Sequence, residues 1–107
     1  MNKLLIAIAA LAGIVASGTT QAADAAKAKQ LAQKYNCLAC HSEDKKLVGP
    51  AYKDIAKKYK GDSGAAAKLA TKVKAGGGGA WGTIPMPPNN VPEADIKTLV
   101  DWILSLS

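Results

Sequence analysis

The segment Cys37-Leu38-Ala39-Cys40-His41 brings two thiols and one imidazole together. Three chemistries use this pattern: a disulfide or thioredoxin-like redox pair, half of a zinc site, and the attachment of a c-type haem. The sequence pattern predicts no βαβ unit, which a thioredoxin-like site would need. The chain also has no further Cys or His to complete a zinc site. A disulfide across two residues would restrain little of the chain. Haem attachment uses all three side chains and is therefore the favoured interpretation.

Met86 is a candidate for a second iron ligand, because it is the one methionine besides Met1. A haem ligated by His and Met needs one of each, on opposite faces of the ring. Met86 lies in Ile84-Pro85-Met86-Pro87-Pro88, where the prolines restrict the backbone and reduce the entropy lost on ordering. Such a stiff segment suits a weak thioether ligand. The plainer alternatives are core filler or an ordinary proline-rich turn.

Four helices are expected to position these groups, because apolar residues recur there with helical spacing. They are predicted at 25–36, 51–59, 64–75 and from about Pro92 onward. Asp24 is the expected N-cap of the first helix, and the glycines at 76–79 end the third. No segment shows sustained period-2 alternation, so the sequence predicts an all-α domain with long ordered loops.

Residues 1–22 have the pattern of a secretory signal peptide. Lys3 precedes an apolar run from Leu4 to Val15, and Thr20-Gln21-Ala22 ends in a small residue, with Ala23 a competing cut site. The run of about 12 residues is shorter than the roughly 20 that a membrane span needs. Removing 22 of the 107 residues leaves 85, at 23–107, and lowers the net charge from +6 to +5 because only Lys3 is lost. We therefore expect one exported domain without stable membrane insertion.

This domain has few bulky side chains for its core. Phe is absent, the aromatic residues are three Tyr and two Trp, and many apolar residues are alanine. Domains of this size often need a disulfide, a metal or another bound group to be stable. Trp102 is expected to pack the last helix against the first, near Leu31 and Tyr35.

The sequence resembles the small bacterial class I cytochromes c, which are monohaem, periplasmic and His/Met-ligated, over the whole of 23–107. The order and spacing of five motifs carry the resemblance. The motifs are Cys37-Leu38-Ala39-Cys40-His41, Val48-Gly49-Pro50-Ala51-Tyr52, Trp81-Gly82, Ile84-Pro85-Met86-Pro87-Pro88-Asn89 and Trp102. The resemblance implies a cytochrome c fold, with about four short helices wrapped around one covalently bound haem c. Cys37 and Cys40 would form the thioether bonds, and His41 and Met86 would ligate the iron.

Further haem-site roles follow from the same resemblance. The Pro50 carbonyl would accept a hydrogen bond from the ligating His41, and the Asn89 amide would bond the sulfur of Met86. The Trp81 indole would donate to a haem propionate. Lys72 stands where similar proteins often have a basic residue near a propionate. The plainer readings are a Gly-Pro turn, a turn asparagine, a core tryptophan and an exposed helical lysine.

The implied function is electron transport rather than catalysis: single electrons are shuttled between respiratory redox proteins in the periplasm. The resemblance implies a redox partner of one of four kinds: nitrite reductase, a terminal oxidase, a peroxidase or a quinol–cytochrome complex. The alternatives are a haem sensor or peroxidase-like protein in which the Met ligand dissociates, and a subunit that docks permanently on a larger oxidoreductase. The expected protein is a monomer.

Lysines in the middle of the chain could steer acidic partners toward transient contacts, or could simply keep the helices soluble. They are Lys45, Lys46, Lys53, Lys57, Lys58, Lys60, Lys72 and Lys74. Nucleic-acid binding is poorly supported, because the chain has no arginine and is expected to be exported.

Overall fold

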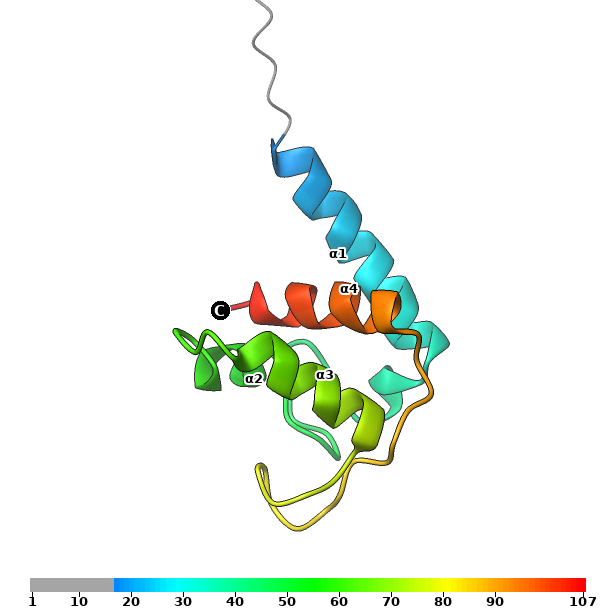
Figure 1. The fold of residues 1–107 in the computed structure, drawn as a ribbon, viewed down its shortest axis with the longest axis vertical. Coiled ribbons are helices and arrows are strands. Elements are labelled where there is room, and N and C mark those ends of the chain that lie inside the picture. The colour runs from blue at the N-terminus through cyan, green and yellow to red at the C-terminus, as the bar shows by residue number, and fades with distance from the viewer. Residues whose placement is uncertain (1–16) are drawn as a thin grey trace, which may run out of the picture.

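The computed structural model describes residues 17–107, and within that range the chain is helical and has no β-strand. The four α-helices are α1 (Ser17–Lys34), α2 (Tyr52–Lys58), α3 (Ala65–Ala75) and α4 (Glu93–Leu104). A short 3-10 helix, η1 (Cys37–Ala39), follows α1. The all-α class with four helices is confirmed (Figure 1).

The helix bounds agree closely with the sequence prediction for α2, α3 and α4, but not for α1. Helix α1 begins at Ser17, so Asp24 lies inside it and the predicted N-cap is wrong. It ends at Lys34, before the predicted Asn36, because Asn36 has a φ of 61°. Asn tolerates this left-handed conformation, which a helix cannot continue through.

Most of the predicted signal peptide, residues 1–16, lies outside the described residues. Across residues 17–107, none of the helices has both the length and the apolar character that a bilayer crossing requires.

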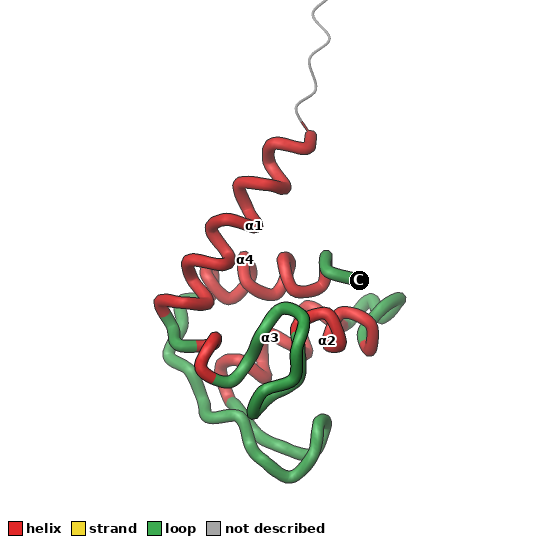
Figure 2. The backbone as a smooth tube through the Cα atoms, turned by 180° about the vertical axis from the view of Figure 1, so that it is seen from behind, coloured by secondary structure: helices red, strands yellow, loops and turns green. Residues whose placement is uncertain are grey.

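Helix α4 is the element against which α1, α2 and α3 all pack (Figures 1 and 2). The apolar stripe predicted at Ile96, Leu99, Val100, Ile103 and Leu104 is buried except at its last residue, Leu104, which is half-buried. Ile96 and Val100 form one cluster with Leu31 and Ala32 of α1. Burial of this stripe stabilises the fold by removing apolar surface from water.

Trp102 packs α4 against α1 as predicted, but its predicted neighbours are wrong. It clusters with Ala28 and Tyr52, whereas Leu31 and Tyr35 belong to the other cluster. Trp102 follows Val100 by two residues, which is about 200° of rotation around a helix. Trp102 therefore lies on a different face of α4 from Val100, which clusters with Leu31.

Helix α3 has a poorly buried inner face. Leu69 and Val73 are half-buried, and Ala66, which helical spacing places on the same face, is exposed. Leu69 and Val73 line a cavity, together with the loop that follows α3. Because the inner face of α3 is incompletely buried, the protein core has a cavity beside this helix.

Candidate functional site

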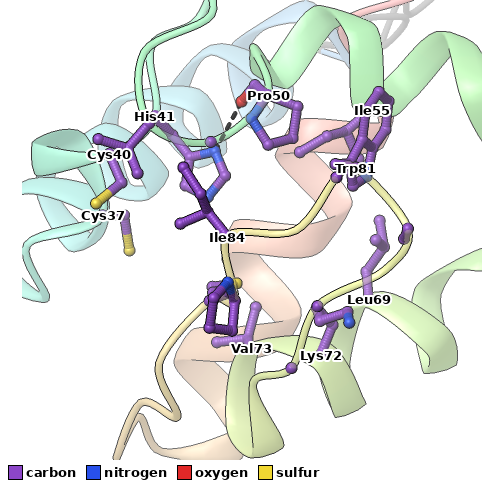
Figure 3. A pocket seen from close by; sticks show the side chains of 18 of the residues that line it. Cys37, Cys40, His41, Pro50, Ile55, Leu69, Lys72, Val73, Trp81 and Ile84 are labelled. Carbon is purple, nitrogen blue, oxygen red and sulfur yellow. Dashed lines mark hydrogen bonds between the residues drawn. The ribbon is translucent and has the colours of Figure 1, made fainter.

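The cavity has a volume of about 490 Å³, within the roughly 300–1,000 Å³ typical of cofactor sites. One wall is formed by η1 and the loop after it, and the opposite side by α3 and the loop at 77–87. Leu99, Val100 and Ile103 of α4 also contribute apolar lining. Figure 3 shows labelled side chains from η1, the loop after it, α3 and the loop at 77–87 around the same space.

His41 is buried, and its ring orientation is fixed by a hydrogen bond across the following loop. Its Nδ1 lies 2.7 Å from the carbonyl oxygen of Pro50 (Figure 3). A carbonyl only accepts, so Nδ1 carries the hydrogen and Nε2 keeps its lone pair. This is the contact that the resemblance implies for Pro50, and it leaves Nε2 as the nitrogen that could bind a metal.

The backbone around His41 explains how the loop holds this geometry. The amide of His41 donates to the carbonyl of Cys37 at 2.9 Å, and the amide of Gly49 donates to that of Cys40 at 2.8 Å. A side chain on Gly49 would start 2.6 Å from Cε1 of His41, so only glycine allows this close approach. The turn at Gly49-Pro50 therefore both closes the loop and positions the imidazole.

Cys37 and Cys40 are not joined in a disulfide, and both are half-buried in the cavity wall. Burial raises the pKa of the Cys37 thiol, against the opposing effect of hydrogen bonds from the Tyr52 side chain and the Cys37 backbone. A raised pKa keeps the thiol protonated, whereas a thioredoxin-like redox pair depends on a low-pKa thiolate. Cys37 therefore does not have the lowered pKa that such a redox pair uses.

Met86 lines the same cavity as His41, although it comes from a distant part of the sequence. Its backbone pairs with Gly77 through two hydrogen bonds, amide to carbonyl in both directions, each 2.9 Å long. Together, the Cys37 and Cys40 thiols, the free Nε2 of His41 and the Met86 thioether surround one apolar cavity. This donor set and these walls fit a haem.

The other residues predicted at the site lie in three different environments. The side-chain amide of Asn89 donates to the carbonyls of Pro87 at 2.9 Å and Val73 at 3.3 Å, so a bond to the Met86 sulfur would have to replace one of these. Trp81 is 41% exposed at the cavity rim, and the core alternative for it is wrong. Lys72 lines the cavity from α3.

Trp81 is held at the rim by Lys58 of α2. The Lys58 Nζ lies 4.7 Å from the centre of a Trp81 ring and donates a hydrogen bond to the carbonyl of Ala80 at 3.2 Å. A cation over an aromatic face is attracted by the ring's quadrupole. Lys58 therefore ties the loop after α3 to α2.

Tyr52 is a site residue whose role the sequence reasoning missed. Its ring stacks on His41 with centroids 5.1 Å apart, and Trp102 meets it edge-on at 5.5 Å. Burial, with a smaller contribution from Cys37, raises the pKa of Tyr52 above its usual value and keeps the phenol neutral. The signal in the sequence is the motif Val48-Gly49-Pro50-Ala51-Tyr52, in which the resemblance gave Tyr52 no role of its own.

An all-α fold around a cavity with these four donors defines a small c-type haem protein. The chain belongs to the cytochrome c family, whose sequence model matches residues 25–107. Its relatives are class I monohaem bacterial cytochromes c-551 and c-552.

Three similar proteins illustrate the match. Cytochrome c-551 of Allochromatium vinosum is 61% identical over 77 residues, which are 71% of this chain and 82% of that protein. Cytochrome c-552 of Hydrogenobacter thermophilus is 48% identical over 103 residues, which are 96% of this chain and 95% of that protein. The crystal structure of wild-type Nitrosomonas europaea cytochrome c552 matches with a TM-score of 0.72 and 57% identity, covering 74% of this chain and 99% of that one.

These matches establish the class of activity. The chain is an electron carrier that exchanges electrons with redox partners, and it is not an enzyme. As a member of this family it carries one covalently attached haem c with iron.

Proposed function

We propose that this chain shuttles single electrons in the periplasm with a haem held by Cys37 and Cys40 and ligated by His41 and Met86. The observation that carries the proposal is that His41, with Nδ1 committed to Pro50, lines the same cavity as Met86. When bound, the haem supplies a one-electron Fe(III)/Fe(II) couple.

The residues of the chain favour electron exchange over chemistry on a substrate. The Pro50 carbonyl fixes the orientation of His41 and increases its basicity as a ligand. The prolines beside Met86 and its backbone bonds to Gly77 hold the thioether in place. With His41 and Met86 both bound to the iron, neither oxygen nor peroxide would find an open site on it.

The ligand assignment is tested with Met86→Ala, using Ile84→Ala as the control. Ile84 lies in the same proline-rich segment and also lines the cavity, but its side chain has no atom that could ligate iron. We expect Met86→Ala to keep its covalent haem, measured as a pyridine haemochrome, and to lose the near-infrared sulfur–iron charge-transfer band and the high potential. Ile84→Ala should keep both. Retention of both by Met86→Ala would overturn the assignment.

Carbon monoxide binding by the unmodified, reduced protein separates the electron carrier from a haem sensor or peroxidase-like protein. A carrier with both axial positions filled should bind carbon monoxide poorly at neutral pH. Rapid binding would favour a Met86 that dissociates.

The docking face that we propose is the rim of the cavity. Of the eight lysines in the middle of the chain, Lys53 pairs with Asp44 and Lys74 with Glu93. The others form no ion pair within residues 17–107, and they are Lys45, Lys46, Lys57, Lys58, Lys60 and Lys72. Lys46 and Lys72 line the cavity, beside exposed apolar side chains of the same rim. An apolar contact with a positive border suits brief encounters with acidic redox proteins.

The docking proposal is tested by the rate of electron exchange with hexacyanoferrate, an anionic probe, at several ionic strengths. Lys46→Gln and Lys72→Gln should slow the exchange and weaken its salt dependence. Lys29→Gln, on α1 and away from the cavity lining, is the control. Equal effects of all three changes would show that total charge, and not the rim, controls the rate.

Export to the periplasm is proposed from the signal-peptide pattern of residues 1–22. Cleavage after Ala22 would shorten α1 but keep its buried residues, Ala28, Leu31 and Ala32. N-terminal sequencing of the protein from a periplasmic extract should read Ala23 or Asp24 first. Recovery of intact Met1 would contradict this, and elution only within a large complex on size exclusion would contradict a free monomer.

A further inference from the structure

The segment that carries Met86 crosses the C-terminal end of α3 and is fastened there. Gly76 is the residue that ends α3, and its amide donates to the carbonyl of Lys72 at 2.8 Å. The next residue, Gly77, makes the two backbone bonds to Met86. The position of Met86 therefore depends on the path of the chain as it leaves α3.

Gly76 has no room for a side chain, and the obstacle is the Met86 segment itself. A Cβ on Gly76 would overlap the carbonyl oxygen of Met86, and it would lie 2.7 Å from the nitrogen of Pro88 and 2.8 Å from the carbonyl carbon of Pro87. All three are backbone atoms, so no rotation of a side chain can make room. Gly76 also has φ 71° and ψ −157°, a conformation that essentially only glycine adopts.

The Met86 segment cannot easily move away from Gly76, because it is fastened on the other side as well. The backbone amide of Asn89 donates to the carbonyl of Val73 at 3.1 Å, and the Asn89 side-chain amide donates to the same oxygen at 3.3 Å. Val73 lies in the last turn of α3, whose carbonyls have no partner within the helix. Moving the segment away would leave these groups without their partners.

We infer that Gly76 is a positioning residue for the axial ligand: its missing side chain lets the Met86 backbone lie against the end of α3 and so sets where the thioether sits. This inference rests on the proposed ligation by Met86. Gly76 does not line the cavity, so it would act on the redox site through the Met86 segment that lies against it.

The test is Gly76→Ala in the complete haem-bound protein, with Gly61→Ala as the matched control. Gly61 also has a positive φ, 81°, but a Cβ there would meet nothing within 4 Å. In Gly76→Ala we expect the sulfur–iron charge-transfer band to disappear at a lower pH than in the unmodified protein. The midpoint potential should shift toward that of Met86→Ala. Hydrogen exchange at the amides of Gly77 and Met86 should become faster.

Two results would overturn the inference. One is a Gly76→Ala protein whose band and potential match those of Gly61→Ala. The other needs no variant: if the reduced, unmodified protein shows no nuclear Overhauser effect between the α-protons of Gly76 and the δ-protons of Pro88, the close approach is absent. This second measurement keeps the test decisive even if Gly76→Ala does not fold.

Failure of the ligand assignment gives a different result. If Met86→Ala keeps the charge-transfer band, the proposed ligation falls and the inference falls with it. If Met86→Ala loses the band while Gly76→Ala behaves like the control, only the role of Gly76 is wrong.

Discussion

Gly49 lies against the imidazole ring of His41, so close that a Cβ on Gly49 would be 2.6 Å from Cε1, 3.0 Å from Nδ1 and 3.2 Å from Nε2 of the ring. Tyr52 also stacks on the ring, at a centroid distance of 5.1 Å. His41 is therefore in contact with both a backbone turn and an aromatic ring, with Nδ1 bonded to Pro50. Its orientation is set by packing as well as by the hydrogen bond.

The first prediction is that Gly49→Ala displaces the imidazole. Overpacking of this kind costs about 1–3 kcal/mol, which guanidinium unfolding of the haem protein would measure. A shift in the reduction potential should accompany it, because the His41–Pro50 bond is disturbed. Gly64→Ala is the control, because a Cβ there would have its nearest contacts at 3.4 and 3.6 Å and the φ is negative. Equal stability of the two variants would contradict the prediction.

The second prediction concerns the core. The double variant Cys37→Ser, Cys40→Ser should lose its haem on a denaturing gel and lose most of its helical circular dichroism. Leu69 and Val73 line the haem cavity and would lose their apolar partner, at roughly 2.5 kcal/mol for each ~100 Å² left unburied. Ala39→Ser, an exposed position between the two cysteines, should keep both haem and helicity. A stably helical double variant without haem would show that the protein side chains form a sufficient core.

The third prediction concerns the loop after α3. Lys58→Met removes both the cation over Trp81 and the hydrogen bond to Ala80, a loss of about 0.5–1 kcal/mol for an exposed cation–aromatic contact. We expect faster hydrogen exchange in residues 79–82, where the Gly79 amide donates to the carbonyl of Gly82 at 3.0 Å. Lys57→Met removes the same charge from the same helix without touching the loop. If both variants exchange alike, Lys58 does not anchor Trp81.

The fourth prediction is a pH dependence at the start of α3. The Lys68 side chain, at 2.8 Å, and then the Gly64 amide hold the pKa of Asp62 below its usual value. A lowered pKa in the folded state means that this stabilisation is present above the usual carboxyl pKa near 4 and is lost as the pH falls through the folded-state value. In Lys68→Met the pKa of Asp62 should rise but stay below its usual value, because the Gly64 bond remains.

Carboxyl-carbon chemical shifts measured against pH would follow this titration. Lys60→Met, at a lysine that forms no ion pair within residues 17–107, should leave the Asp62 titration unchanged. An unchanged Asp62 pKa in Lys68→Met would show that the ion pair is not formed in solution.

The sequence alone determined which groups could do the chemistry and which segments could be helices. The motif at 37–41, the lone Met86 and the helical spacing of apolar residues in α2, α3 and α4 are local patterns, and local patterns fix residue type and periodicity. The start of α1 and the left-handed Asn36 were not predicted, because they depend on where backbone angles change and not on apolar spacing.

Tertiary structure decided how those groups are held. Trp102 joins Tyr52 and not Leu31, since the face of α4 that it occupies turns toward α2. Gly49 matters because its backbone lies against the His41 ring across a loop. Gly76 matters because its backbone lies against the Met86 segment, which comes later in the chain. A sequence shows only that these residues lack side chains. Only the packed backbone shows that a side chain there would collide with His41 or with the Met86 segment, which carry the two proposed ligands.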